Sequence, residues 1–481
     1  MSAPAASLVH SAEAQAAPRS ATLRYLASAA AVLILLLLWF LPLGLEEQAQ
    51  RAIAIASFMV VLWVTELVPH AITGLIGCWL FWALGVAPVR TAFAGFSVSE
   101  APWFLLGALL IGTMVTESGL ARRVAYAILA HVGTSFSRVL LAFLITNFLM
   151  TFMVPAGPPR VILLGSIALG AVASYGLSAK SNIATALILA VTFSATLNDK
   201  TILGSTPAIL ARSLIVEHGH VPVYWSQWLI AYAPLGIANL LLVWWLTLRL
   251  YPPEVKDLPG GPGFLRQRSA ELGPWTAREK RAAFWILAAV ALWLTDFLHH
   301  VSPAIIGLGV GLATVLPGVG ALTTGDLKKV NFYIILFMGT ALSMAEVLRD
   351  TGAVRMLSDM MFAVVSPWVQ STLDATVFLY WSAFLAHLLL ASETSMISVT
   401  MPVIMDLSLR SGLDPLAVGL IWSFATGGKL FIYQSLVLIA GYAFGCYSAR
   451  DVAKIGAFFL IVQWALLLLI VPFYWPLLGI G

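Results

Sequence analysis

The sequence predicts an all-α polytopic membrane protein with two inverted repeats, about 11 transmembrane helices and two re-entrant hairpins. Three observations lead to this fold class. Hydrophobic residues make up 60% of the 481 residues and charged residues only 10%, which is far from the average of soluble domains. Apolar stretches long enough to cross a bilayer recur along the chain. Motifs and helix interruptions occur twice, in the same order.

A helix needs roughly 20 apolar residues to cross the hydrocarbon core, and at least nine stretches qualify or nearly qualify. Among these apolar stretches are residues 23–45, 52–68, 102–116, 225–250, 282–298, 332–348 and 457–478. The first stretch is expected to be a retained helix rather than a cleaved signal peptide, because its core is long and the following "GLEEQAQR" is a poor cleavage site.

Basic residues predict the orientation of the chain. The longest polar interval, residues 251–281, is rich in Pro, Gly, Lys and Arg, and the positive-inside rule makes it a cytoplasmic linker. Arg122 and Arg123 should lie on the same side, as should the N-terminus with Arg19 and Arg24. We therefore expect a multi-pass protein of the cell's inner (plasma) membrane with a cytoplasmic N-terminus.

Three pairs of short motifs indicate a duplication. "WVTE" and "WLTD", "ESGLARR" and "DTGAVRM", and "TLNDK" and "ATGGK" are separated by 230, 233 and 229 residues (Trp63 to Trp293, Glu117 to Asp350, Lys200 to Lys429). Five full crossings lie between the first pair if residues 136–155 enter the membrane and return. Because five is odd, the second copy is inverted, as in secondary transporters.

The repeats divide the chain into six parts. Each repeat is expected to contain scaffold helices, a hairpin tip and an unwound helix. The parts are a cytoplasmic tail (1–22), a first transmembrane helix (23–50), the first repeat (51–250), the linker (251–281), the second repeat (282–450) and a C-terminal transmembrane helix (451–481).

Each repeat contains two interruptions of its apolar pattern. "FMVPAGPPRVILL" and "ASETSMIS" predict hairpin tips near 156–160 and 392–394, because a proline cluster cannot continue a helix. "TLNDKTILGSTPA" and "ATGGKLFIYQS" predict unwound stretches near 196–208 and 425–435. Such breaks expose carbonyls that suit cations and helix N-termini that suit anions.

Together with these interruptions, "WVTELVPHAIT", "MVTESGLARRVAYAIL" and "YQSLVLIAGYAFGCYSARDVAKIG" resemble the divalent anion:sodium symporter family from about residue 52 onward. The resemblance implies a scaffold domain, a mobile transport domain that moves as an elevator, and a homodimer. It also implies that each hairpin tip reads Ser-Asn-Thr and contacts substrate carboxylates and sodium. The matching residues are Ala156, Gly157 and Pro158, and Ser392, Glu393 and Thr394, of which only Ser392 and Thr394 keep the pattern.

The departures from that pattern introduce charge. We hypothesise that Glu393 pairs with Lys429, that Arg160 or Lys200 offers positive charge to the anion, and that sodium dependence is weakened or lost. Intramembrane ions are usually functional. The expected substrate positions are Ala156, Gly157, Arg160, Lys200, Ser392, Glu393, Thr394 and Lys429. The positions expected to form or replace a cation site are Asn198, Asp199, Glu393, Ala425, Gly427 and Lys429.

Each charge also has a plainer interpretation. Lys429 would then extend to an interface, Lys200 and Asp199 would satisfy each other in a solvated loop, and Arg160 would face lipid headgroups. Glu393 is alternatively a proton carrier, because burial raises the pKa of a carboxylate whereas a nearby lysine lowers it.

The predicted function is secondary transport of a small divalent anion, with dicarboxylates first. The alternatives are a sodium-coupled sulfate or tricarboxylate symporter and a sodium-independent exchanger. An enzyme or a channel is a different class, but no nucleophile–base pair or metal set is evident. We expect no cofactor beyond sodium or protons as coupling ions, no metal beyond sodium, and no nucleic acid partner.

Overall fold

The computed structural model describes residues 21–481 except 43, 66, 155, 202–203, 258–262, 366, 370 and 391. Over this part of the chain the secondary structure is helical, and the one β feature is an isolated bridge between Ser135 and Asp257. The predicted all-α class is confirmed. Arg19 and most of the predicted tail, residues 1–22, lie outside the described residues.

The helices fall into two series of similar order. The first runs through α2 (Ala21–Phe40), α3 (Glu47–Thr65), α4 (His70–Ala83), α5 (Val89–Ala92), η1 (Ala94–Phe96), α6 (Ala101–Glu117), α7 (Leu120–Leu129), α8 (Phe136–Thr151), α9 (Gly157–Ser174), α10 (Asn182–Asn198), α11 (Thr206–Gly219) and α12 (Trp225–Leu250). Linker helix α13 (Gly263–Glu271) precedes the second: α14 (Ala277–Leu294), α15 (Asp296–His299), α16 (Pro303–Ala313), α17 (Thr324–Leu327), α18 (Phe332–Asp350), α19 (Ala353–Val365), α20 (Thr372–Leu389), α21 (Glu393–Arg410), α22 (Pro415–Ala425), η2 (Ile432–Gln434), α23 (Leu436–Tyr442), α24 (Ala449–Phe473) and η3 (Trp475–Leu478).

Corresponding helices begin at similar separations. The first residues of α6, α9 and α10 precede those of α18, α21 and α22 by 231, 236 and 233 residues (Ala101 to Phe332, Gly157 to Glu393, Asn182 to Pro415). These values agree with the motif separations of 229–233 and with the separation of the hairpin tips. The helix order therefore supports the duplication, and the domain boundaries remain our proposal.

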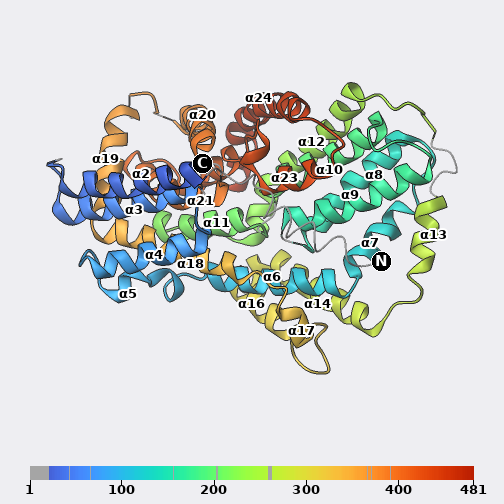
Figure 1. Cartoon of the computed structure of the whole chain (residues 1–481), viewed down its shortest axis with the longest axis horizontal. Helices are drawn as coiled ribbons and strands as arrows, with labels where there is room; N and C mark the ends of the chain where they lie inside the picture. Colours follow the sequence, from blue (N-terminus) through green and yellow to red (C-terminus); the bar gives the residue numbers. More distant parts are fainter. Residues whose placement is uncertain are drawn as a thin grey trace.

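The two series pack through pairs of equivalent contacts: where a helix of one series packs against a helix of the other, the counterparts of these two helices also pack together. α6 packs against α16, and their counterparts α18 and α4 pack against each other. Likewise α11 packs against α21, and their counterparts α23 and α9 pack together (Figure 1). Reciprocal contacts of this kind are expected of two repeats related by a pseudo-two-fold axis.

Glycine allows the closest of these helix crossings. A Cβ atom on Gly107 of α6 would lie 2.2 Å from the carbonyl oxygen of Gly307 in α16, and one on Gly311 would lie 2.7 Å from the Cα atom of Gly107. On the opposite pair, a Cβ on Gly74 of α4 would lie 2.0 Å from the Thr340 hydroxyl of α18. Small residues at such positions are the usual means by which membrane helices approach closely.

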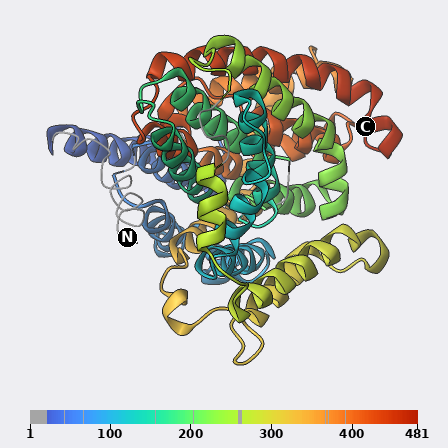
Figure 2. The same cartoon turned by 90° about the vertical axis from the view of Figure 1, so that its right-hand side faces the viewer.

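Five described helices are long and apolar enough to cross a membrane, or six if the bent pair α6–α7 counts as one span. Shorter apolar helices, including α4, α8, α10, α16 and α22, accompany them. The chain is thus a multi-pass membrane protein, whereas the number of about 11 crossings stays a prediction. Figure 2 shows α24 along the edge of the bundle opposite α14.

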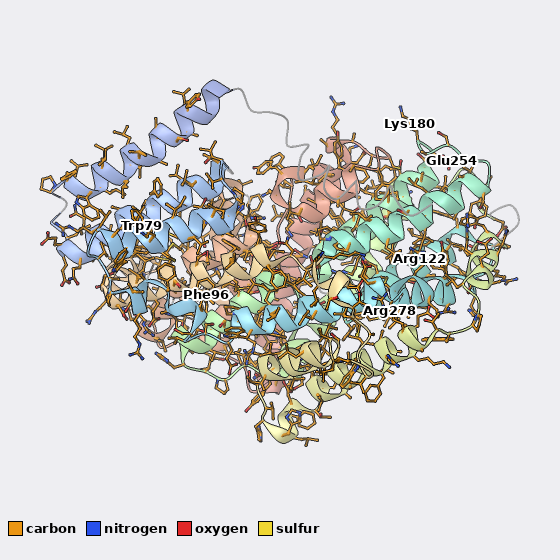
Figure 3. The ribbon with its side chains drawn as sticks, turned by 60° about the horizontal axis from the view of Figure 1, so that its bottom comes forward. Trp79, Phe96, Arg122, Lys180, Glu254 and Arg278 are labelled. Carbon is orange, nitrogen blue, oxygen red and sulfur yellow. The ribbon has the colours of Figure 1, made fainter. Side chains whose placement is uncertain are left out.

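The linker packs against the basic helix α7. The Arg123 guanidinium donates to the Gly273 carbonyl oxygen at 2.9 Å and pairs with Glu279 at 2.7 Å. Arg122, Lys180, Glu254 and Arg278 lie toward the same end of the molecule (Figure 3). The linker and α7 therefore share one side, as expected from their basic residues, and its assignment to the cytoplasm remains a prediction.

Candidate functional site

Two helices begin inside the protein, at the ends of the predicted hairpins. α8 ends at Thr151, and α9 begins at Gly157 with Ala156 as its N-cap. α20 ends at Leu389, and α21 begins at Glu393 after the N-cap Ser392, whose hydroxyl accepts from the Ser395 amide at 3.3 Å. A proline in the first turn suits the start of α9, because that position needs no amide hydrogen.

The first unwound stretch is shorter than predicted. α10 continues to Asn198 and α11 begins at Thr206, so the break spans residues 199–205 rather than 196–208. The second break follows α22 after Ala425 and lasts until α23 begins at Leu436, apart from one turn of 3₁₀ helix. Both breaks carry ionic side chains.

Arg160, in the first turn of α9, is fully buried. Its guanidinium donates to the Asp199 carboxylate and to the Thr151 hydroxyl. The Asp199 carboxylate also lies against the start of α9, since a Cβ atom on Gly157 would be 2.9 Å from Asp199 Oδ2. A carboxylate is stabilised both by an arginine and by the positive end of a helix.

Lys200 follows Asp199 in the chain but points toward the second repeat. Its ammonium contacts the Glu393 carboxylate and the Thr426 hydroxyl, and donates to the Ser423 carbonyl oxygen at 2.9 Å. The Lys200 side chain is only 2% exposed. This contact joins the break after α10 to the start of α21.

Glu393 also contacts the second lysine. Lys429 Nζ lies 3.1 Å from Glu393 Oε2, and the Thr426 hydroxyl lies 2.9 Å from Glu393 Oε1. Both charged side chains are largely buried, at 3% exposure for Lys429 and 11% for Glu393. As the first residue of α21, Glu393 is close to the positive end of that helix.

The five ionic side chains form one buried cluster between the repeats. We call it the charged cluster: Arg160, Asp199, Lys200, Glu393 and Lys429. Three cations and two carboxylates give it a formal charge of +1. Charges in a low-dielectric interior are costly unless paired, so an excess of positive charge here favours a bound anion.

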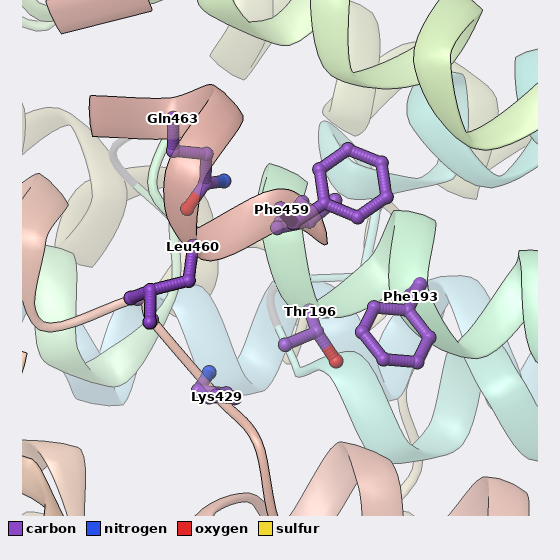
Figure 4. A pocket seen from close by; sticks show the side chains of 9 residues that line it. Phe193, Thr196, Lys429, Phe459, Leu460 and Gln463 are labelled. Atoms are coloured by element: carbon purple, nitrogen blue, oxygen red, sulfur yellow. The ribbon is translucent and has the colours of Figure 1, made fainter. Parts of the chain in front are cut away.

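A small cavity lies behind Lys429. It is lined by Gly427, Gly428, Lys429 and residues of α10 and α24, and its volume of about 10 Å³ is about enough for a single water molecule. Figure 4 shows Thr196, Phe193, Phe459, Leu460 and Gln463 around it. The cavity therefore reaches the second unwound stretch from the side of α24.

Residues 20–480 match the family model described as the sodium:sulfate symporter transmembrane region. The chain belongs to this family, the divalent anion:sodium symporters. It is accordingly a membrane transporter and not an enzyme.

Relatives within the family support this class. A protein described as "Membrane protein" from Cupriavidus necator is 28% identical, over 94% of this chain and 92% of its own. "Sodium-dependent dicarboxylate transporter SdcS" of Staphylococcus saprophyticus is 25% identical, over 80% of this chain and 78% of its own. "Dicarboxylate transporter 2.1, chloroplastic" of Arabidopsis thaliana is also 25% identical, over 84% and 74%.

The structure brings together the five charged residues among the predicted site residues. The contact between Glu393 and Lys429 is present as hypothesised. Two plainer interpretations are wrong. Arg160 is fully buried and faces Asp199 rather than headgroups, and Lys200 is buried against Glu393 instead of sharing a solvated loop with Asp199.

The remaining predicted residues take structural positions in the described structure. Ala156 and Ser392 are N-caps. The Asn198 amide donates to the Ser194 hydroxyl at 3.2 Å. The Ala425 carbonyl oxygen accepts from the Gly428 amide at 3.4 Å, and the Gly427 amide donates to Phe424 at 2.9 Å. Thr394 follows Glu393 in the first turn of α21.

Sequence reasoning missed the hydroxyls that complete the cluster. Thr426 bridges Lys200 and Glu393, and Thr151 accepts from Arg160. Thr426 sits in "ATGGK", directly after the last residue of α22. A hydroxyl at the end of a helix beside a predicted ion was the signal that would have identified it.

The backbone of Lys429 rests on a glycine of α24, which gives a test of the loop's position. A Cβ on Gly456 would lie 2.2 Å from the Lys429 carbonyl oxygen. We expect Gly456→Ala to lower stability by about 1–3 kcal/mol and to reduce substrate uptake in proteoliposomes. Gly309→Ala is the matched control, because that helical glycine has nothing within 4 Å of the added atom. Equal uptake by the two variants would show that the Lys429 loop tolerates displacement.

Proposed function

We propose that the protein is a secondary transporter of small divalent organic anions, with C4 dicarboxylates as the first candidates. Arg160, Lys200 and Lys429 supply the positive charge that holds the anion. The observation that carries this proposal is the buried charged cluster, in which the cations outnumber the carboxylates where the two repeats meet. The helix starts at Gly157 and Glu393 add two further positive ends.

The distribution of the cations suits a substrate with two anionic ends. Arg160 lies at the start of α9, whereas Lys200 and Lys429 meet at the start of α21. A carboxylate takes charge-assisted hydrogen bonds from either arrangement. One carboxylate of a C4 molecule would bind at each helix start.

Fixed cations replace sodium in this proposal. At the positions where the resemblance implies neutral tip residues and sodium, the chain carries Glu393 and, beside them, Arg160, Lys200 and Lys429. A lysine or arginine held in place supplies the positive charge that a bound sodium ion would bring. We therefore propose that transport continues without sodium, by exchange or with a proton as the coupling ion.

The proposal includes the movement and the assembly implied by the family resemblance. The hairpins and unwound helices form a transport domain that moves as an elevator against the scaffold helices, within a homodimer in the inner membrane. The N-terminus is cytoplasmic. Reciprocal packing of equivalent helices supports the inverted repeats on which this movement depends.

A sodium-coupled symporter is the second candidate, and the observation that favours it is the similarity to relatives named as sodium-dependent dicarboxylate transporters. Sulfate is a further candidate substrate, since the matching family model bears that name. Tricarboxylates remain an alternative on the family resemblance.

Counterflow in proteoliposomes tests the proposal. Vesicles preloaded with unlabelled succinate should take up labelled succinate faster than empty vesicles, because only a carrier shows this acceleration. We expect the same rate in choline and in sodium buffer. Strict sodium dependence would exclude replacement of sodium by fixed cations, and uptake that ignores preloading would indicate a channel. Citrate and sulfate as competitors would separate the substrate classes.

A further inference from the structure

The two carboxylates of the charged cluster occupy the places that the carboxylates of a substrate would need. Asp199 binds Arg160 at the start of α9. Glu393 binds Lys200, Lys429 and the Thr426 hydroxyl at the start of α21. The described structure thus shows both anion positions already satisfied by the protein itself.

The charge of the cluster sets a second condition. Its side chains sum to +1, so a dianion would leave one uncompensated negative charge in a buried site. Burial of an unpaired charge costs several kcal/mol. One proton taken up by a carboxylate of the cluster restores neutrality.

We infer that Glu393 competes with the substrate for Lys200 and Lys429, and that it accepts one proton when a dianion displaces it. This inference rests on the proposed function and assigns the coupling ion of that site. The proton comes from the aqueous phase that delivers the substrate and is bound to a carboxylate oxygen of Glu393. No other bond is made or broken.

Glu393 suits this role better than Asp199 because its partners are lysines. Lysine ammonium groups are point charges on flexible stems and can turn to a new anion, whereas the planar arginine fork holds its partner in a fixed geometry. The Asp199 backbone is fixed as well, because its carbonyl oxygen accepts from the Ser205 hydroxyl at 2.6 Å. Protonated Glu393 would keep a partner in Thr426, whose hydroxyl lies 2.9 Å away.

Other ionisable groups near Glu393 are poor proton acceptors. His387, on α20, is fully buried, and its Nε2 atom has no hydrogen-bond partner in the described structure. Its electrostatic neighbours are Lys200 and Lys429, so a proton on its ring would add a third positive charge beside two others.

Among the described residues, the other elements packed against α21 supply no further ion-pair partner to Glu393. Ionic groups of these elements have partners elsewhere. Arg410 pairs with Asp406 and Asp359 at the far end of α21, Arg349 with Glu346 on α18, and Arg51 with Glu47 on α3. On α11, Arg212 donates to the Val223 carbonyl oxygen and Glu217 accepts from the Ser213 hydroxyl. In the described part of the chain, the ionic partners of Glu393 are therefore Lys200 and Lys429, and His387 is a neighbour of these two lysines.

Proton uptake on substrate binding tests the inference without a transport assay. Purified protein in weakly buffered detergent solution at pH 7.5, with a pH-indicator dye, is mixed with pH-matched succinate, and separately with sulfate. We expect about one proton taken up per bound dianion, and a dissociation constant that falls about tenfold per pH unit on acidification. Glu393→Gln should bind about tenfold more tightly at pH 7.5, take up no proton and lose the pH dependence.

Proton uptake retained in Glu393→Gln would show the inference to be wrong, because another carboxylate of the cluster, such as Asp199, would then take the proton. Should Glu393→Gln not fold, a wild-type dissociation constant independent of pH would overturn it equally. If a dianion binds without proton uptake, only this inference is wrong. If neither succinate nor sulfate binds, the proposed function is wrong as well.

Discussion

Lys200→Met is expected to abolish transport. The ammonium group of Lys200 links the break after α10 to Glu393, Thr426 and the Ser423 carbonyl oxygen. Its loss removes one of the two cations that would bind the substrate carboxylate at the start of α21. Glu393 is then left with Lys429 alone. Truncating one partner of a buried charge pair costs 2–5 kcal/mol or more, so substrate affinity should fall by about 100-fold. Binding of labelled succinate to purified protein measures the change.

Lys180→Met is the matched control for this experiment. Lys180 precedes α10 as Lys200 follows it, but its side chain is exposed (Figure 3). Methionine at position 180 should leave affinity and stability within error of the wild type. If Lys200→Met kept normal affinity while the protein stayed folded, the anion would have to bind through Arg160 and the helix starts without this lysine.

Sequence patterns predicted the places of the breaks better than the partners of the charges. Clustered prolines and glycines in apolar runs mark the helix interruptions, because proline removes a hydrogen-bond donor and both residues disfavour a helix interior. The structure accordingly begins α9 at Gly157 and ends α22 at Ala425. The first break was predicted too long, since Asn198 still completes α10.

The pairing of Lys200 could not be predicted from its neighbours in the chain. Asp199 and Lys200 are adjacent, and adjacency suggests a mutual ion pair. Successive side chains at the end of a helix nevertheless point in different directions, so Asp199 turns to Arg160 in its own repeat and Lys200 to Glu393 in the other. Contacts between residues far apart in the chain depend on how the repeats pack.

The burial of Arg160 has a signal in the sequence. An arginine within an apolar run is expensive in a membrane unless it has a carboxylate partner, and the first carboxylate that follows Arg160 in the chain is Asp199. The plainer interpretation placed Arg160 at the lipid headgroups instead. In the structure the prolines before Arg160 start a buried helix, and that start places Arg160 beside Asp199.

The Arg160–Asp199 pair yields the largest expected effect on stability. Asp199→Asn would leave a fully buried guanidinium with no carboxylate partner among the described residues. Breaking a buried pair in this way costs about 3–5 kcal/mol, which is a large part of the stability of a typical protein. Thermal unfolding of the purified protein should show a much lower midpoint. The double variant Arg160→Gln with Asp199→Asn should recover most of that stability, because no unpaired charge remains, yet should not bind succinate.

An exposed pair provides the control that separates burial from charge. Asp359 pairs with Arg410 but its side chain is 59% exposed, so Asp359→Asn should change stability by no more than about 1 kcal/mol. A double variant less stable than Asp199→Asn alone would mean that the two side chains do not depend on each other. A bound dianion should raise the midpoint of the wild type by mass action and should not raise that of the double variant, because the cation that holds one end of the anion is gone.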